Sequence, residues 1–124
     1  MTSHEFKHLR IEYRGPATVI CFIESVLVDH EMVTAVGQEL LSAHDLSPES
    51  HFIVSFAGVE AISSAGIGKL ITLNRRAHRH ECLLLLCDME ADVAELFVSS
   101  RLDTYFQIFT TLAEALEHAG GASG

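Results

Sequence analysis

Three short and mostly apolar runs, separated by segments with helical periodicity, constrain the fold of this chain most strongly. They are Val19–Ile23, His51–Phe56 and Glu81–Cys87. A strand that is apolar on both faces has to be covered on both sides, as happens when crossover helices pack over a parallel sheet. The sequence therefore predicts an α/β fold with one mixed, mainly parallel sheet and crossover helices.

Turn and capping signals place the other elements. Gly15-Pro16 marks a turn between the first two strands, Asp29 can cap the first long helix, and Thr111–Glu114 fits a capping box. The order is β-β-α-β-α-β-α-β-α, with an antiparallel hairpin at one edge. The expected elements are strand His8–Arg14, strand Ala17–Ile23, helix His30–His44, strand His51–Phe56, a helix from Ser63–Gly68 to about His78, strand Glu81–Cys87, helix Ala91–Ser99, strand Tyr105–Phe109 and a helix ending near Ala119.

The chain is of a size and composition that suit one folded unit. It has 124 residues, of which 48% are hydrophobic, so a real core can be buried. No repeat or second domain is visible. We expect a single domain over residues 1–124, with its core at about 8–119 and a small-residue tail, 120–124, that frays.

Charge and hydropathy exclude several classes of partner. The net charge is −9, with 17 acidic against 8 basic residues, which disfavours nucleic acid and anionic membranes. No apolar stretch approaches the roughly 18 residues that span a bilayer, and the polar start of the chain lacks an export segment. We therefore expect a cytoplasmic location. Cys21, Cys82 and Cys87 have no regular spacing and are expected to be reduced thiols.

The run Val59–Leu70 holds the main functional candidate. A short apolar strand ends, Ser63 and Ser64 follow, and Gly66 and Gly68 open a helix. A small nucleophilic side chain at a helix N-terminus lies where negative charge is favoured, which suits a phosphorylatable switch. The two glycines would let a partner backbone approach. Serine is also a common N-cap, so one of the two hydroxyls serving only to cap the helix is the alternative interpretation.

These residues, with the element order, resemble the STAS family, the domain of anti-sigma factor antagonists. The resemblance runs from about Leu9 to Ala119. The family typically has an apolar strand, then Asp-Ser-(Ser/Thr)-Gly-Leu-Gly, then an apolar helix, and Ser63–Gly68 matches that motif. Val93–Phe106 resembles its third helix and last strand, and Thr111–Leu116 resembles the start of its C-terminal helix.

The resemblance implies a regulatory role and not an enzyme. In the family, an anti-sigma factor that is a serine kinase phosphorylates the serine matched by Ser64, and the unphosphorylated form binds this partner and frees the sigma factor. Asp29 matches an aspartate of the partner-facing surface. Ser63 and Ser55 stand where the family usually has aspartates. The expected partner-binding residues are Asp29, Ser63, Ser64, Gly66, Gly68 and Lys69.

Two other functions remain as alternatives. The chain could be a STAS subunit of a lipid-transport or signalling scaffold complex that is not phosphorylated. The chain could also be a small hydrolase that uses Ser64, although no Gly-x-Ser-x-Gly elbow or phosphate-loop motif supports that function. A serine phosphatase is a further candidate partner, and no cofactor is expected.

The region after the motif is rich in bases and histidines. Lys69, Arg75, Arg76 and Arg79 are half of the basic residues, and they form either a docking patch for an acidic partner or a solvated face that complements the helix C-terminus. The spacing of His78 and His80 alone is a weak metal signal, so no metal site is expected.

Overall fold

The structure, a computed structural model, describes residues 6–123. A five-stranded sheet has the order β1-β2-β4-β6-β7, in which β1 is antiparallel to β2 and the other neighbours are parallel. The predicted mixed, mainly parallel sheet is confirmed. The elements are β1 Leu9–Arg14, β2 Ala17–Phe22, β3 Val26–Leu27, α1 His30–Leu46, β4 His51–Ser55, β5 Ala61–Ile62, α2 Ser64–Arg79, β6 Leu84–Cys87, α3 Ala91–Ser99, β7 Gln107–Phe109 and α4 Leu112–Ser123.

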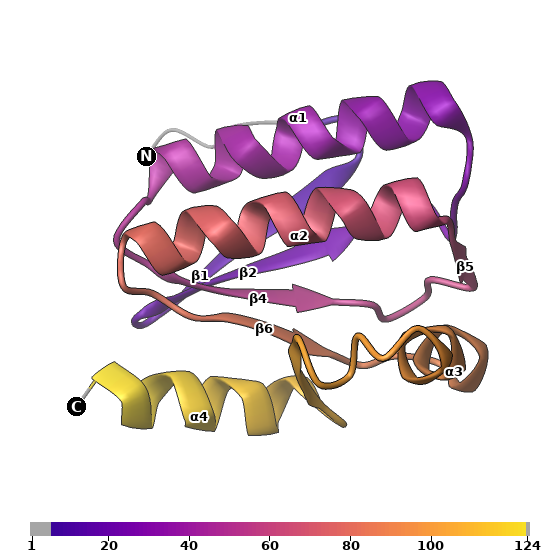
Figure 1. The fold of residues 1–124 in the computed structure, drawn as a ribbon. Helices are drawn as coiled ribbons and strands as arrows, with labels where there is room; N and C mark the ends of the chain where they lie inside the picture. Colours follow the sequence, from indigo (N-terminus) through magenta and orange to yellow (C-terminus); the bar gives the residue numbers. More distant parts are fainter. Residues whose placement is uncertain (1–5, 124) are drawn as a thin grey trace.

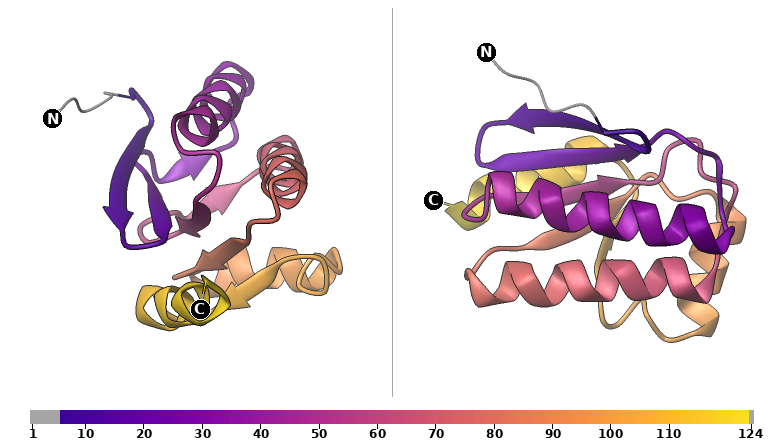
Figure 2. Two further views of the ribbon diagram at one scale, coloured as in Figure 1. Left: turned by 90° about the vertical axis from the view of Figure 1, so that its left-hand side faces the viewer. Right: turned by 90° about the horizontal axis from the view of Figure 1, so that it is seen from above.

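The sheet is covered on both faces (Figures 1 and 2). Helices α1 and α2 lie side by side over one face, and α4 covers the other. Alternate residues of the central strands divide between the two sides: Val54 and Leu86 face α1 and α2, whereas Ile53 and Leu85 pack with Ala115 of α4. This double burial explains why these strands read as continuous apolar runs.

The structure also contains a second, two-stranded sheet that was not predicted from the sequence. Strands β3 and β5 pair in parallel through Val26 with Ala61 and Leu27 with Ile62. Each has two residues, too few to show any periodicity, and their pairing joins segments 35 positions apart in the chain. They matter because each leads directly into the N-terminus of a long helix.

Several element ends differ from those predicted. Strand β6 begins at Leu84 and not at Glu81, because Glu81 has a left-handed φ of 59° and the Cys82 N–H still bonds to the Ala77 carbonyl. Helix α4 continues to Ser123, past the end near Ala119, with its buried Ala115 and Ala119 against the sheet. Gly124 lies outside the described residues. None of the described helices is long and apolar enough to cross a membrane.

Candidate functional site

The two serines that open α2 have different roles. Ser63 is the N-cap, with φ −87° and ψ 166°, and its Oγ accepts a hydrogen bond from the Gly66 N–H at 3.2 Å. Ser64 is the first helical residue and is exposed. Within residues 6–123, its hydroxyl makes no hydrogen bond. Of these two serines, Ser63 alone therefore caps the helix, and the exposed hydroxyl of Ser64 is not needed for any hydrogen bond of the described structure.

The electrostatics of this helix end favour an anion. The first turn of α2 contains no acidic residue, whereas Arg76, His78 and Arg79 lie in its last turn. Unsatisfied N–H groups and the helix dipole attract negative charge at an N-terminus. Because Ser63 is uncharged, a phosphate on Ser64 would meet no neighbouring carboxylate in this turn.

The small β3–β5 sheet brings the N-termini of α1 and α2 to the same end of the molecule (Figure 1). The Ser63 N–H donates to the Leu27 carbonyl at 3.0 Å, which ties the start of α2 to the segment that precedes α1. Asp29 caps α1, since its Oδ2 accepts from the Met32 N–H at 3.1 Å. Asp29 is exposed, so it can cap the helix and still present its other oxygen to solvent.

The two glycines of the motif differ in their surroundings. Gly66 is buried, and a Cβ there would lie 2.8 Å from Cγ1 of Ile62 and 3.5 Å from the Leu27 carbonyl oxygen. Its bare backbone allows α2 to pack closely on β3 and β5 and is turned away from any partner. Gly68 is half-buried, and a Cβ there would meet no atom of the described residues within 4 Å. The predicted open approach for a partner therefore fits Gly68 but not Gly66.

Lys69 lies between the two long helices. A Cβ on Gly37 of α1 would come within 2.5 Å of the Lys69 Cδ, so the alkyl chain of Lys69 covers that glycine. The lysine also lines a groove of about 180 Å³ between α1 and α2, together with Thr34 and Thr72. Its stem packs while its ammonium remains near the surface, as long basic side chains commonly do.

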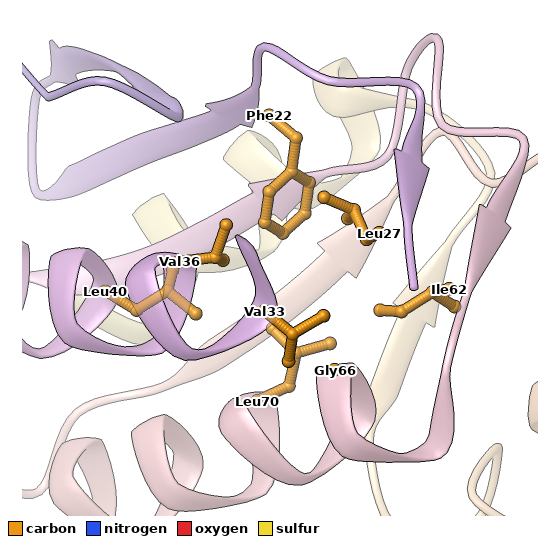
Figure 3. Close-up of a pocket in the computed structure, with 8 residues that line it drawn as sticks. All are labelled: Phe22, Leu27, Val33, Val36, Leu40, Ile62, Gly66 and Leu70. Atoms are coloured by element: carbon orange, nitrogen blue, oxygen red, sulfur yellow. The ribbon is translucent and has the colours of Figure 1, made fainter. Parts of the chain in front are cut away.

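The space beneath the N-terminus of α2 is nearly filled (Figure 3). The cavity there measures about 10 Å³, room for one water at most. Figure 3 shows that apolar side chains from β2, β3, β5 and both helices converge on it; the lining residues are Phe22, Leu27, Val33, Val36, Leu40, Ile62, Gly66 and Leu70. The side chains beneath the start of α2 are therefore closely packed, and this cavity has no room for a small-molecule ligand.

Two exposed valines flank this surface and were not singled out in the sequence analysis. Val26 in β3 is 41% exposed, and Val28, just before the Asp29 cap, is 50% exposed. Since β3 pairs with β5, both valines lie beside the start of α2. They were missed because a two-residue strand gives no alternation from which to tell the buried Leu27 from its exposed neighbours.

Comparison with known proteins identifies the family. The model of the STAS domain family matches residues 11–115. This chain belongs to the STAS domain family. None of the curated proteins matches its sequence.

Solved structures share the STAS fold at low identity. An anti-sigma-factor antagonist (STAS) domain protein from Planctomyces limnophilus is 20% identical with a TM-score of 0.79, over 90% of this chain and 96% of that chain. The phosphorylated form of the Bacillus cell fate determinant SpoIIAA is 19% identical with a TM-score of 0.65, over 89% and 97%. The murine anion transporter Slc26a9 is 13% identical with a TM-score of 0.71, over 86% of this chain and 18% of that one.

The second departure from the usual STAS pattern, Ser55, has a structural explanation. Ser55 is buried at the end of β4, and its Oγ donates to Oδ2 of Asp88 at 2.7 Å. Asp88 follows β6 and has a left-handed φ of 63°. An aspartate at position 55 would set two carboxylates against each other, which is unfavourable where burial weakens screening. Here the carboxylate at this place belongs to Asp88, the residue that follows the neighbouring strand β6.

Cys87 contacts the same carboxylate. Its Sγ donates to Oδ2 of Asp88 at 3.4 Å. Burial, followed by the charge of Asp88, raises the pKa of the Cys87 thiol to about 12. Because the thiolate is the reactive form, this cysteine stays unreactive at neutral pH.

The four basic residues of α2, Lys69, Arg75, Arg76 and Arg79, do not form a single patch, although Arg76 and Arg79 line the same pocket. Lys69 covers Gly37, and Arg76 forms an ion pair with Asp45 of α1 at 3.2 Å, whereas Arg75 and Arg79 are exposed. His78 and His80 are exposed as well, and no group of three metal-binding side chains is found in the described part of the chain.

Proposed function

We propose that this STAS domain is an anti-sigma factor antagonist whose binding is switched by phosphorylation of Ser64. The observation that supports this most is the division of work between two adjacent serines. Ser63 caps α2, while the exposed Ser64 hydroxyl has no hydrogen bond among residues 6–123. A kinase could modify Ser64 without removing any interaction that holds the helix. The SpoIIAA structure, which shares the fold, is of a phosphorylated form.

A phosphate at Ser64 would have opposite effects on the domain and on a complex. It adds about −1.5 to −2 charges, which the N-terminus of α2 can stabilise. A docked partner would instead bury an unpaired dianion, which desolvation and repulsion both oppose. A penalty of about 2–3 kcal/mol weakens binding roughly 30- to 150-fold, enough for a switch.

The proposed binding face lies around the N-termini of α1 and α2. It combines the exposed carboxylate of Asp29, the valines beside it and the exposed start of α2. The partner would be an anti-sigma factor with serine kinase activity in the cytoplasm, and a serine phosphatase would restore the binding form. The domain itself would act by binding and would not be an enzyme. The proposed face comprises Val26, Val28, Asp29, Ser63, Ser64, Gly68 and Lys69, with Gly66 supporting it from below.

Phosphate transfer to matched variants tests the assignment. The anti-sigma factor kinase, recovered by pull-down from the source cell, is mixed with ATP and the wild type, Ser64→Ala or Ser63→Ala. We expect phosphate on the wild type and Ser63→Ala, because both retain the exposed Ser64, and none on Ser64→Ala. Labelling of Ser64→Ala at the wild-type level would overturn the site.

A constitutive STAS subunit is the second candidate. Ser63 in place of the usual aspartate favours it, since a hydroxyl cannot orient the neighbouring serine as a carboxylate would. The similarity to part of the anion transporter Slc26a9 shows that this fold also occurs within transport proteins. Pull-downs with wild type and Ser64→Asp separate the two: a switch loses its partner in the aspartate variant, and a constitutive subunit retains it.

A further inference from the structure

A polar pocket lies at the end of α1 and α2 that is remote from Ser64. It measures about 290 Å³ and is formed by the last turns of both helices and the following residues. With a rise of 1.5 Å per residue, Arg79 lies about 22 Å along α2 from Ser64. The two helices run side by side in the same direction, so this pocket and the Ser64 surface are at opposite ends of the molecule (Figure 1). The lining residues are His44, Asp45, Pro48, Arg76, Arg79 and His80.

His44 is the unusual member of this pocket. Its side chain is almost completely buried, and within the described residues 6–123 neither ring nitrogen has a hydrogen-bond partner. The nearest carboxylate oxygen, Oδ1 of Asp45, is 3.8 Å from Nδ1. The ring packs between Phe52, at a centroid distance of 5.3 Å, and His80, at 5.1 Å. Burial, then the charges of His80 and Arg76, lowers the pKa of His44, so its ring is neutral and carries one N–H without an acceptor.

The charges around the pocket favour an anion. Among the described residues, two guanidinium groups and one carboxylate line it, and that carboxylate, of Asp45, already pairs with Arg76 at 3.2 Å. Arg79 forms no ion pair within the described part of the chain. This local positive excess occurs in a chain of net charge −9. Basic residues in a last helical turn are often explained by the helix dipole, but the dipole does not account for an enclosed, unpartnered imidazole.

The carbonyl groups at these helix ends form the negative ends of the two helix dipoles, which the guanidinium groups have to outweigh for an anion to bind. The carbonyl groups of His44, Ala77 and His78 accept hydrogen bonds from the N–H groups of Ser47, His80 and Glu81 respectively. Guanidinium and imidazole N–H groups are the donors that the lining side chains offer a ligand, beside the carboxylate of Asp45. Planar guanidinium groups match the oxygens of phosphate well.

We propose that this pocket binds a phosphate dianion, either inorganic phosphate or a phosphomonoester. Arg76 and Arg79 supply the charge, and His80 at the pocket wall supplies a further N–H donor. The buried nitrogens of His44 reach the ligand once the ring turns toward the pocket, which would give its N–H the acceptor it lacks. The site is independent of the proposed switch, because it uses none of the residues around Ser64.

NMR titration of the folded protein tests this site. Imidazole ring signals are followed while inorganic phosphate, and separately O-phosphoserine, is added at constant ionic strength. We expect saturable shifts of the His44 and His80 signals with at least one ligand. Arg79→Gln should weaken binding tenfold or more. Arg75→Gln is the matched control: it removes the same charge one turn away, from a residue outside the pocket, and should change the affinity less than twofold.

The two ligands identify the source of the phosphate. Saturation by both supports a site for free phosphate, and saturation by O-phosphoserine alone supports a site for a phosphomonoester. The proposal is overturned if neither ligand gives saturable shifts. It is also overturned if Arg75→Gln and Arg79→Gln weaken binding equally, because the shifts would then report only the general field of α2.

Discussion

At the residue scale, the proposed function depends on two neighbouring serines, Ser63 and Ser64. The sequence locates both at the start of a helix, because Gly66, Gly68 and the preceding apolar strand mark that boundary. It could not tell which serine caps, since that depends on whether the first helical residue is 64 or 65. The structure places the helix start at Ser64, and Ser63 therefore bonds to Gly66.

Alanine variants of the two serines should differ in stability. Ser63→Ala removes the cap and should lower the free energy of unfolding by about 1 kcal/mol. Ser64→Ala should change it by less than about 0.5 kcal/mol, because an exposed side chain with no bond is lost. Urea denaturation monitored by circular dichroism measures both. A larger loss for Ser64→Ala would show that the capping assignment is reversed.

The motif glycines provide a second pair of variants. Gly68→Ala should stabilise the fold by about 0.5–1 kcal/mol, because it fits open space within a helix. Gly66→Ala should destabilise it by about 1–3 kcal/mol, because its Cβ would overlap the buried Ile62 side chain. Thermal unfolding of both variants gives the comparison, and stabilisation by Gly66→Ala would contradict the close packing described here.

Two histidines should make stability fall in mild acid. Burial lowers the pKa of both His44 and His51 below 6.5, and His51 also accepts the Leu83 N–H through Nδ1. As the pH falls, the unfolded chain therefore binds protons at these histidines before the folded protein does. Their contribution to the free energy of unfolding is complete above pH 6.5 and is lost as the pH falls below that value. We expect a slope of at most about 1.4 kcal/mol per pH unit for each histidine. Urea unfolding at pH 7.5 and 5.5 measures it, and His51→Gln should reduce the difference.

At the element scale, the main helices and strands could be predicted because their signals are local. Apolar runs mark β4 and β6, and Asp29 marks the start of α1. Strands β3 and β5 could not be predicted, because each has only two residues, which show no pattern, and their pairing joins segments that are distant in the sequence. These two strands nevertheless determine the geometry of the site, because the hydrogen bond from the Ser63 N–H to the Leu27 carbonyl holds the start of α2 beside the segment that precedes α1.

The contact between Ser55 and Asp88, at the ends of β4 and β6, predicts the effect of a substitution on stability. Ser55→Asp restores the residue usual in the family but would place a buried carboxylate against Asp88, 2.7 Å from the present hydroxyl. We expect a loss of about 2–4 kcal/mol at pH 7. Adding Asp88→Asn should recover at least half of it, since one charge is removed. Chemical denaturation of the single and double variants decides the point. An unimpaired Ser55→Asp would show that the two side chains do not compete.

At the scale of the whole molecule, the two ends of the α1–α2 layer differ in character. The N-termini of α1 and α2 present Asp29, Ser64 and exposed valines, and the other end holds the histidine–arginine pocket. Since the core beneath Ser64 is almost fully packed, a charge placed there should change the surface and leave the fold intact. The sequence predicted the family and the candidate serine, but not the pocket, which exists only where two helix ends meet.

The most direct test measures one affinity in two states of the protein. Isothermal titration calorimetry compares unmodified and Ser64-phosphorylated protein binding to the anti-sigma factor, with circular dichroism reporting the fold of each. We predict that phosphorylation weakens binding roughly 30- to 150-fold while the unfolding free energy changes by less than about 1 kcal/mol. Equal affinities, or weakened binding that accompanies unfolding of the domain, would contradict a switch built on an exposed serine.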